Sequence, residues 1–422
     1  MKVSCLTLGA LLCVQSLTLA SGLPAPDIVV AADGSGNFKT IQAALASIPN
    51  TNRERTVVFV KNGVYHEKVR VDASFVTLRG QSRSGTRIEY AQLNDDFTNH
   101  PDALGTGVVN LNHANDFVME NLSAVNTAGV VGPHAFTVSG SGDQTVLQDC
   151  DLLSEGADTV ALGKGEGGRH YIARCNLRGS VDFLCPRGWC YVTDTTFYET
   201  KNTAAVWHDG RWASDMKLVL KNCKFDGVQN WNLARHHVDA QFFFVNCVFS
   251  KSMTNLAPFR VIYPDNPIRN AELDKLNHWG ERAYFYHCYR EGGDYPWHRD
   301  NLSSATNDPA PDKLTAAWTF AGKWDPERKD RPVIKSADSG EGRIRLIFDE
   351  PVTVKGKPRV ALGAARLGNY AFGSGTDTLT FLCSSQTPDE VKSVDLNGGA
   401  IVASEAGASI RRASLELPKM QN

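Results

Sequence analysis

A short alternation of apolar and polar residues recurs along the first two thirds of this chain. Each copy reads apolar, variable, usually Asn or Asp, then Cys or Thr, variable and apolar, as in LQDCDL at 147–152. The Cys or Thr position falls at Cys150, Cys175, Thr195, Cys223, Cys247 and Cys288. The first five lie 20 to 28 residues apart, and the last follows after 41, which requires an insertion. The alternation predicts strands with one inward face, and the period is typical of stacked repeats.

These copies predict a parallel β-solenoid, in which each coil adds short strands to those of the coil before it. Gly, Asn, Asp and Ser gather between the copies, as turns require. No helical pattern of useful length occurs there, which disfavours a sheet built from strand–helix–strand units. An antiparallel sandwich whose strands are similar by chance is the alternative that the repeats alone leave open.

The segments on either side of the repeats predict a covered solenoid. Thr40–Pro49 has apolar residues at helical spacing, with Thr40 as its cap, and this helix would cover the open first coil. Three strands are expected after it, at Arg55–Val60, Val69–Val71 and Val76–Arg79. Residues 251–330 are rich in Trp, Tyr, Asp and Pro and predict a last coil with extended segments on the solenoid surface, held by Trp318 and Trp324.

The pattern changes near residue 333. The segment 325–332 is charged and flanked by proline, which favours a domain boundary. Short strands separated by turn residues follow at Ile344–Phe348, Val352–Val354, Arg359–Leu362 and Thr378–Leu382. They predict a small antiparallel β-sandwich of about 85 residues, so the whole chain is expected to be all-β.

Composition narrows the compartment and the partners. The 44 basic and 46 acidic residues give a formal net charge of -2, which supplies no reason to expect a nucleic-acid partner. Lys2, an apolar run over 6–19 and small residues at 20–22 predict a signal peptide at 1–22 and a secreted or periplasmic protein. The run is short and broken by polar residues, and no other stretch could span a bilayer, so we expect no membrane partner.

Eight cysteines remain after removal of the signal peptide. Export permits disulfides, and Cys185 and Cys190 are close enough in sequence to pair. The cysteines of the repeated column are expected to stack as small buried apolar residues, and their spacing resembles no zinc site. We expect at most two disulfides and no metal or organic cofactor.

His134, Asp158 and Asp182 follow one another at a spacing of 24 residues, about one coil of such a solenoid. Coils that stack ~4.8 Å apart would place this imidazole and these two carboxylates in a ladder on one face. Two close carboxylates do not ionise together easily, so one can serve as an acid while the other serves as a nucleophile. Coincidence is the alternative, with each aspartate a structural residue of a solenoid turn.

Several ordered blocks of sequence carry a resemblance to a known family. They are Asp33–Ala44, Gly63–Glu67, Leu78–Gly80, Asn126–Val138, Ala157–Val160, Gly179–Leu184 and Leu233–His237. From about residue 27 to residue 325 the chain resembles the pectin methylesterases, secreted carbohydrate esterases with a right-handed parallel β-helix fold. The resemblance implies a catalytic β-helix at 27–330, followed by an accessory domain at 333–420. The C-terminal strands resemble Ig-like modules appended to bacterial exported proteins.

The resemblance also implies roles for individual residues. Asp182 matches the family nucleophile, Asp158 its general acid/base and Arg235 the arginine that pairs with the nucleophile. His134 and Ala157 stand where the family has two glutamines of the oxyanion site. A neutral imidazole has one N–H donor, so His134 can replace one lost amide. A structural histidine at 134 and a surface salt bridge at 235 are the alternatives.

Four residues are candidates for contact with a sugar substrate: Phe183, Trp207, Trp231 and His237. His237 replaces an aromatic residue that lines the sugar groove in the family. Aromatic faces often stack on sugars, but core packing accounts for each tryptophan equally well.

The function that the resemblance implies is that of an exported, monomeric carboxylic-ester hydrolase that removes methyl esters from pectin or a related uronate polymer. Arg235 would favour the ionised form of Asp182, and the charge of Asp182 would keep Asp158 protonated. A hydrolase or lyase of the same polymer is one alternative. The other is a non-catalytic polysaccharide-binding protein in which the lost glutamines mark decay.

Overall fold

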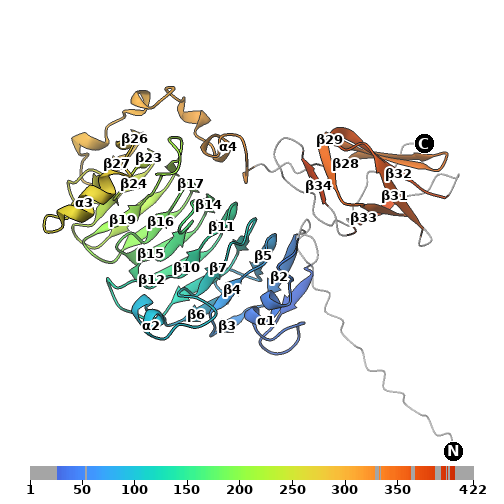
Figure 1. Ribbon diagram of the computed structural model, residues 1–422, viewed down its shortest axis with the longest axis horizontal. Coiled ribbons are helices and arrows are strands. Elements are labelled where there is room, and N and C mark those ends of the chain that lie inside the picture. Colours follow the sequence, from blue (N-terminus) through green and yellow to red (C-terminus); the bar gives the residue numbers. More distant parts are fainter. Residues whose placement is uncertain are drawn as a thin grey trace, which may run out of the picture.

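The computed structural model describes residues 26–52, 55–327, 332, 334–362, 366–384, 391–395, 397 and 400–403. The predicted signal peptide lies outside the described residues. Within them, the chain forms three long sheets of parallel strands and then a separate antiparallel sheet (Figure 1).

Each regular coil of the first part contributes one strand to each of three parallel sheets, whose strands follow in chain order. Sheet A consists of β1 (Ile28–Val30), β2 (Thr56–Val60), β5 (Val76–Gly80), β8 (Val118–Glu120), β11 (Thr145–Gln148), β14 (Arg169–Ala173), β17 (Trp189–Thr193), β20 (Leu218–Lys221), β23 (Ala240–Val245) and β26 (Glu281–Tyr286). Sheet B consists of β3 (Gly63–Tyr65), β6 (Thr86–Tyr90), β9 (Ser123–Asn126), β12 (Asp151–Ala157), β15 (Asn176–Ser180), β18 (Thr196–Glu199), β21 (Lys224–Gly227), β24 (Val248–Phe249) and β27 (Tyr289–Arg290). Sheet C consists of β4 (Val69–Val71), β7 (Val109–Leu111), β10 (Val138–Gly140), β13 (Val160–Leu162), β16 (Leu184–Pro186), β19 (Ala204–Trp207), β22 (Asn232–His236) and β25 (Phe259–Arg260). The parallel pairing confirms the solenoid and excludes an antiparallel sandwich for this part.

The inward side chains of the three sheets form one continuous apolar core. The helix α1 (Ile41–Ala46) lies at its first coil and buries Ile41, Ala44 and Leu45 in that core. The side chain of Thr40 accepts a hydrogen bond from the N–H of Ala43, so the predicted cap is confirmed.

The repeated column marks a turn that recurs from coil to coil between sheets A and B. The residue before each column position has a φ between 49° and 56°, in the left-handed region. These residues are Asp149, Arg174, Asp194, Asn222, Asn246 and His287. Asn and Asp adopt this conformation with less strain than most side chains, which explains their recurrence before the column.

The column thiols point into the core, as their apolar neighbours require. The Sγ of Cys175 lies 3.6 Å from the carbonyl oxygen of Leu147 in the preceding coil. The seven described cysteines of the solenoid, which lie between residues 150 and 288, form no disulfide. The pairing considered for Cys185 and Cys190 does not occur, because Cys185 lies on β16 of sheet C and Cys190 lies on β17 of sheet A, beyond a turn at Gly188.

The chain leaves the regular coils at two excursions. The helix α2 (Asn94–Asn99) lies between β6 and β7, and α3 (Pro267–Asp274) lies between β25 and β26. The second excursion accounts for the longer gap before Cys288, as the spacing of the column predicts.

The segment after β27 runs along the outer face of sheet A. It contains η1 (Pro296–His298), η2 (Leu302–Ser304), η3 (Pro311–Lys313) and α4 (Ala316–Thr319). Trp318 packs edge-on against Phe243 of β23, with ring centroids 5.3 Å apart. Trp324 packs against Phe320 in the same apolar cluster. The prediction that these two tryptophans hold the late segment on the solenoid is confirmed.

The last part of the chain forms one antiparallel sheet with its own apolar core. Its strands are β28 (Ile334–Gly340), β29 (Arg343–Lys355), β30 (Arg359–Leu362), β31 (Leu367–Phe372), β32 (Thr376–Leu382), β33 (Val391–Asp395) and β34 (Ala400–Ala403). The two strands predicted at Ile344–Phe348 and Val352–Val354 are one long strand, β29, which pairs with β28, β32 and β34. The likeness to Ig-like modules stays a prediction.

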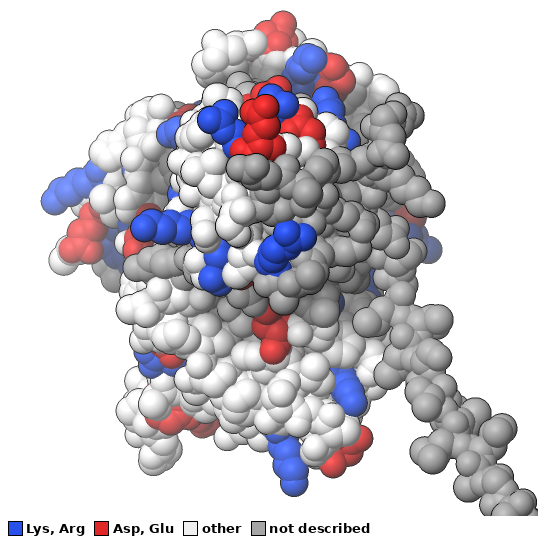
Figure 2. Space-filling view, turned by 90° about the vertical axis from the view of Figure 1, so that its right-hand side faces the viewer, with Lys and Arg blue, Asp and Glu red and all other residues white. Residues whose placement is uncertain are grey.

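Two further properties agree with the composition. None of the helices in the described part of the chain is long and apolar enough to span a bilayer. On the face shown in Figure 2, basic and acidic side chains are interspersed rather than gathered by sign.

Candidate active site

Asp158 and Asp182 occupy equivalent positions on consecutive coils, at the turn from sheet B to sheet C. Asp158 stands between β12 and β13, and Asp182 follows β15 and precedes β16. The N–H of Asp158 donates to the carbonyl of Val181 (3.1 Å), and the N–H of Asp182 donates to that of Ala204 (2.7 Å). Both aspartates have a φ of 57°, a left-handed conformation that Asp tolerates better than most residues. The coil register thus brings together the two carboxylates predicted from the sequence.

His134 lies next to this row but is displaced from it by one residue. It pairs in register with Ala157, a step of 23 residues, rather than with Asp158, and the step is 22 residues further along, where β10 and β13 align Val138 with Val160. The equal spacing of 24 therefore overstates the regularity of the ladder. The Nε2 atom of His134 is 3.9 Å from Oδ2 of Asp158, and the ring is 54% exposed, so it faces the space beside the carboxylate.

Arg235 grips Asp182 through a forked pair of hydrogen bonds. Its Nε lies 2.8 Å from Oδ1, and its Nη2 lies 2.8 Å from Oδ2. Arg235 projects from β22, two coils beyond Asp182, and its register partner on β19 is Trp207. A fork of this kind fixes the plane of the carboxylate as well as its position.

Burial dominates the electrostatics of both aspartates. It raises the pKa of Asp182 to about 6, although the hydrogen bonds and charge of Arg235 act to lower it. It also raises the pKa of Asp158, against the charges of His134 and Arg187. Arg235 favours the ionised form of Asp182, as expected, but does not outweigh burial. The pKa of Asp158 is raised, as expected, but burial rather than the charge of Asp182 is the largest cause.

A buried hydrogen-bond network, which the sequence did not predict, supports the backbone turn that carries Asp182. The N–H of Val181, which has a φ of 42°, donates to Oγ1 of Thr203 at 3.2 Å. Thr203 in turn lies 3.5 Å from Oε1 of Glu199, which also accepts from the N–H of Lys201. Burial raises the pKa of Glu199 to about 9, so this carboxyl group is neutral at pH 7. The network holds a strained β-branched residue directly before the candidate nucleophile.

Two of the four candidates for sugar contact lie at the site. Trp207 is 8% exposed, and its Nε1 donates to Nδ1 of His237 at 2.9 Å. Because Nδ1 accepts, the neutral His237 ring donates from Nε2 to the hydroxyl of Tyr263, 2.7 Å away. Burial lowers the pKa of His237 to about 4, which keeps the ring neutral. These contacts build one wall of the site from sheet C and the excursion before α3.

The other two candidates are core residues, so their predicted contact with substrate is corrected. Phe183 is fully buried and packs against Phe197. Trp231 is fully buried, stacks on Phe225 and donates from Nε1 to Ser250 and Ser252. Phe183 belongs to a conspicuous sequence block, but its neighbour Asp182 alone faces the site, because alternate residues point to opposite sides.

Arg187 is the charged residue of this region that the sequence did not single out. Its guanidinium carbon lies 4.9 Å from the centre of the Trp207 ring. It follows the block Gly179–Leu184 by three residues, and this proximity was the only signal in the sequence that could have pointed to it.

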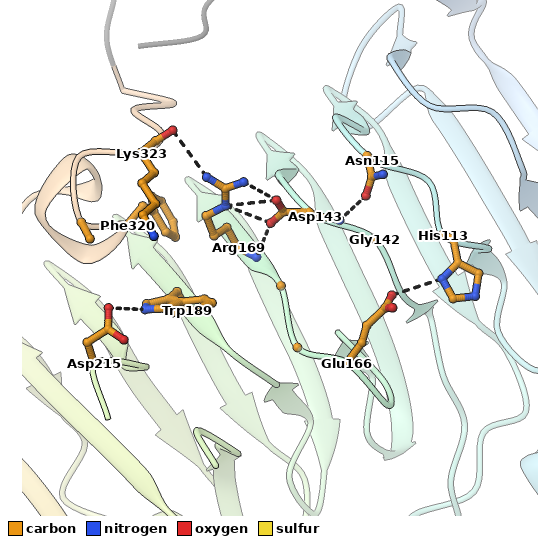
Figure 3. A pocket seen from close by; sticks show the side chains of 13 residues that line it. His113, Asn115, Gly142, Asp143, Glu166, Arg169, Trp189, Asp215, Phe320 and Lys323 are labelled. Carbon is orange, nitrogen blue, oxygen red and sulfur yellow. Dashed lines mark hydrogen bonds and ion pairs between the residues drawn. The ribbon is translucent and has the colours of Figure 1, made fainter. Parts of the chain in front are cut away.

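A hollow of about 480 Å³ lies elsewhere, at the turns from sheet C to sheet A (Figure 3). Two pairs of its ionisable side chains are in contact: Arg169 with Asp143, and His113 with Glu166 at 3.2 Å. None of the predicted site residues lines it. The described residues contain no group of three or more His, Cys, Asp or Glu that could hold a metal ion.

The fold and this site together define a parallel β-helix protein with two aspartates and an arginine at the turn from sheet B to sheet C. A sequence model of the family described as Pectinesterase matches residues 27–242, so the chain belongs to the pectinesterase family.

Curated relatives are similar over part of their length. A pectinesterase of Petunia integrifolia is 31% identical over 207 residues, which is 47% of this chain and 53% of the relative. Probable pectinesterase 49 of Arabidopsis thaliana is 32% identical over 167 residues, 38% of this chain and 44% of the relative. The chain thus spans about half the length of the curated relatives it matches.

Solved structures share the fold. The pectin methylesterase PemA from Erwinia chrysanthemi superposes with a TM-score of 0.57 and 19% identity, over 72% of this chain and 99% of that one. A pectin methylesterase in complex with hexasaccharide VII gives a TM-score of 0.56 and 18% identity, over the same shares of the two chains. At this identity the likeness shows the parallel β-helix alone.

Proposed function

We propose that this protein is an exported ester hydrolase that removes methyl groups from a uronate polysaccharide such as pectin, with Asp182 as nucleophile and Asp158 as general acid/base. The observation that carries the proposal is the fork from Arg235 to Asp182, one coil away from a second aspartate whose pKa is raised by burial. Family membership and the names of the relatives support the same substrate.

In the first step, a carboxylate oxygen of Asp182 attacks the ester carbonyl carbon, and the carbonyl oxygen becomes the oxyanion of a tetrahedral intermediate. The intermediate collapses, the carbon–oxygen bond to the methoxy group breaks, and Asp158 gives its proton to the departing methanol. An acyl anhydride with Asp182 remains. Arg235 keeps the attacking carboxylate oriented throughout.

In the second step, the now ionised Asp158 takes a proton from water, and the resulting hydroxide attacks the acyl carbon of the anhydride. The bond to Asp182 breaks, releasing the free uronate, and both aspartates return to their starting forms. No other reactant is consumed, so one ester and one water give one carboxylic acid and one methanol.

The oxyanion receives fewer donors in this chain than the family pattern provides. His134 can supply one N–H from its exposed ring, whereas the methyl group of Ala157 supplies none. Removal of one oxyanion donor typically lowers the rate by ~10²–10³. We therefore expect weaker turnover of ordinary methylated polygalacturonate than in a family member with both glutamines.

The test is a product assay on a panel of methyl- and acetyl-esterified polysaccharides. We expect methanol without any shortening of the polymer, and nearly complete loss in Asp182→Asn, with unchanged circular dichroism as the control for folding. New reducing or unsaturated ends would instead identify a glycosidase or a lyase. Binding to the polymers without any alcohol release would identify a non-catalytic binding protein.

A further inference from the structure

Trp207 does not present an open aromatic face at the site. It is the one tryptophan in the outward row of sheet C beside Arg235, but one of its faces is covered by the guanidinium of Arg187. Its indole N–H is already used by His237. A sugar ring entering here therefore meets a stacked cation where the sequence predicts an aromatic platform.

The guanidinium of Arg187 retains most of its hydrogen-bonding capacity. Its Nη1 donates to the carbonyl of Cys185 at 3.2 Å, and the structure shows no other hydrogen bond from its side chain among the described residues. Nε and Nη2 are not among the buried side-chain atoms that lack a hydrogen-bond partner, so both remain accessible to solvent. The carboxylate of Asp209, which pairs in register with Arg187, lies 3.6 Å from the guanidinium of Arg211 instead.

The backbone fixes where this cation can reach. The N–H of Arg187 donates to the carbonyl of Leu162, and Arg187 pairs in register with Asp209 at the end of sheet C. From there the side chain turns back over Trp207, toward the centre of the sheet. Its positive charge acts on Asp158 more strongly than that of Arg235 does. Arg187 thus lies nearer to Asp158, the candidate general acid/base, whereas Arg235 is hydrogen-bonded to Asp182.

We propose that Arg187 is a specificity-determining residue that binds a free carboxylate of the substrate next to the ester being hydrolysed. Held over the indole, Arg187 still offers two adjacent N–H groups, at Nε and Nη2, the fork that a carboxylate accepts best. The stacking also removes much of the rotamer freedom that an exposed arginine would lose on binding. The preferred substrate is then a partly de-esterified uronate chain rather than a fully esterified, neutral one. This inference rests on the proposed function for its kinetic part.

The kinetic test compares methanol release from fully methyl-esterified and about half-esterified polygalacturonate. We expect the unaltered enzyme to prefer the half-esterified polymer by about tenfold to a hundredfold in kcat/KM, the range for one charge-assisted pair. Arg187→Gln should abolish this preference by raising KM for the half-esterified polymer alone. Arg178→Gln is the matched control, because Arg178 also lies over an aromatic ring, that of Tyr198 at 4.7 Å, but stands on sheet B and belongs to neither the candidate catalytic set nor the carboxylate site. It should leave the preference unchanged.

A binding measurement separates failure of this inference from failure of the proposed function. Calorimetric titration with an unesterified oligogalacturonate should show affinity that depends on Arg187 and weakens with added salt. Methanol release with an unchanged preference in Arg187→Gln would overturn the inference and leave the esterase intact. Arg187-dependent binding without methanol release would do the opposite. If Arg187→Gln does not fold, Arg187→Lys replaces it. This variant keeps the charge but loses the fork, and it must show a reduced preference.

Discussion

Asp182 and Asp143 are both held by an arginine fork in the turns of one solenoid, and their pKa values move in opposite directions. Arg235 donates to Asp182 at the turn from sheet B to sheet C, and Arg169 donates to Asp143 at the turn from sheet C to sheet A. Burial acts to raise both pKa values. At Asp143, whose side chain is 40% exposed, Arg169 outweighs burial and the pKa falls; at Asp182, only 10% exposed, burial wins and the pKa is about 6.

The difference shows that an arginine–aspartate pair alone does not identify a reactive carboxylate. The pair in the hollow of Figure 3 is satisfied and partly wetted, so its aspartate stays ionised and inert. The buried pair keeps its aspartate near the point of protonation, with a second aspartate beside it. The exposed fraction of the aspartate side chain, rather than the presence of an arginine partner, distinguishes the two sites.

Removal of each arginine gives the largest expected contrast. Arg235→Met should lower methanol release by ~10²–10³, because Asp182 loses both its orientation and the partner of its ionised form. Arg169→Met should leave kcat/KM within about twofold and cost about 1 kcal/mol of stability or less, as expected for a partly exposed pair. Steady-state kinetics and urea unfolding measure both. Similar losses of activity in the two variants would remove the distinction drawn between the sites.

Variants that restore hydrogen-bond donors to the oxyanion position test the same site by an expected gain of activity rather than a loss. Replacing His134 and Ala157 by Gln together should raise methanol release from ordinary methylated polygalacturonate by about tenfold or more, because each added amide N–H can stabilise the developing charge. The single variant His134→Gln shows whether the imidazole already serves as one donor. A fall in the double variant with the fold retained would mean that the site is suited to another ester.

The pH profile tests the position of the Asp182 pKa. The nucleophile must be ionised, and burial raises its pKa to about 6, so kcat/KM should fall about tenfold per pH unit below that pH. At higher pH a second, alkaline limb is expected where Asp158, which must be protonated and whose pKa burial also raises, becomes ionised. Asp143→Asn should leave the acidic limb in place, since its pKa is lowered and it lies at the other turn. An acidic limb centred near pH 4 in the unaltered enzyme would mean that Arg235 outweighs burial after all.

The smallest effect concerns the two tryptophans that sequence treated alike. Trp231→Phe should reduce the free energy of unfolding by about 1–2 kcal/mol, since it leaves a small void and removes the hydrogen bonds from the indole to Ser250 and Ser252, with KM within about twofold. Trp207→Phe should instead raise KM a few-fold, because it removes the hydrogen bond to His237 and alters the platform beneath Arg187. Unfolding curves and KM on half-esterified polymer decide, and a larger KM change in Trp231→Phe would contradict the assignment.

The repeating part of the fold could be predicted because its signals are local. An Asn or Asp before a small buried residue marks the left-handed turn at four of the six column positions, and neighbouring alternation marks the strands. The long strand β29 was split in two at Pro351, since a proline between two apolar runs predicts a break that pairing with β34 overrides.

The candidate site could be predicted only as far as its residues fall in recognisable blocks. Asp158, Asp182 and Arg235 lie together, as expected. The direction in which burial shifts their pKa values could not be predicted, because it depends on neighbours from other coils. Arg187 and Glu199 were missed for the same reason: neither has a local pattern. Arg187 takes its role from Trp207 in the next coil, and Glu199 takes its role from Val181 in the preceding coil, to which Thr203 connects it.

The distance along the chain between Asp182 and its arginine has a consequence for biosynthesis. The two residues are 53 positions apart and meet only when the coils that carry them have stacked. On the proposed mechanism, a growing chain that has folded only its first coils still lacks this pair, and a product truncated before residue 235 would lack it as well. Competence arises in one late step of assembly, well after most of the scaffold that supports it has formed.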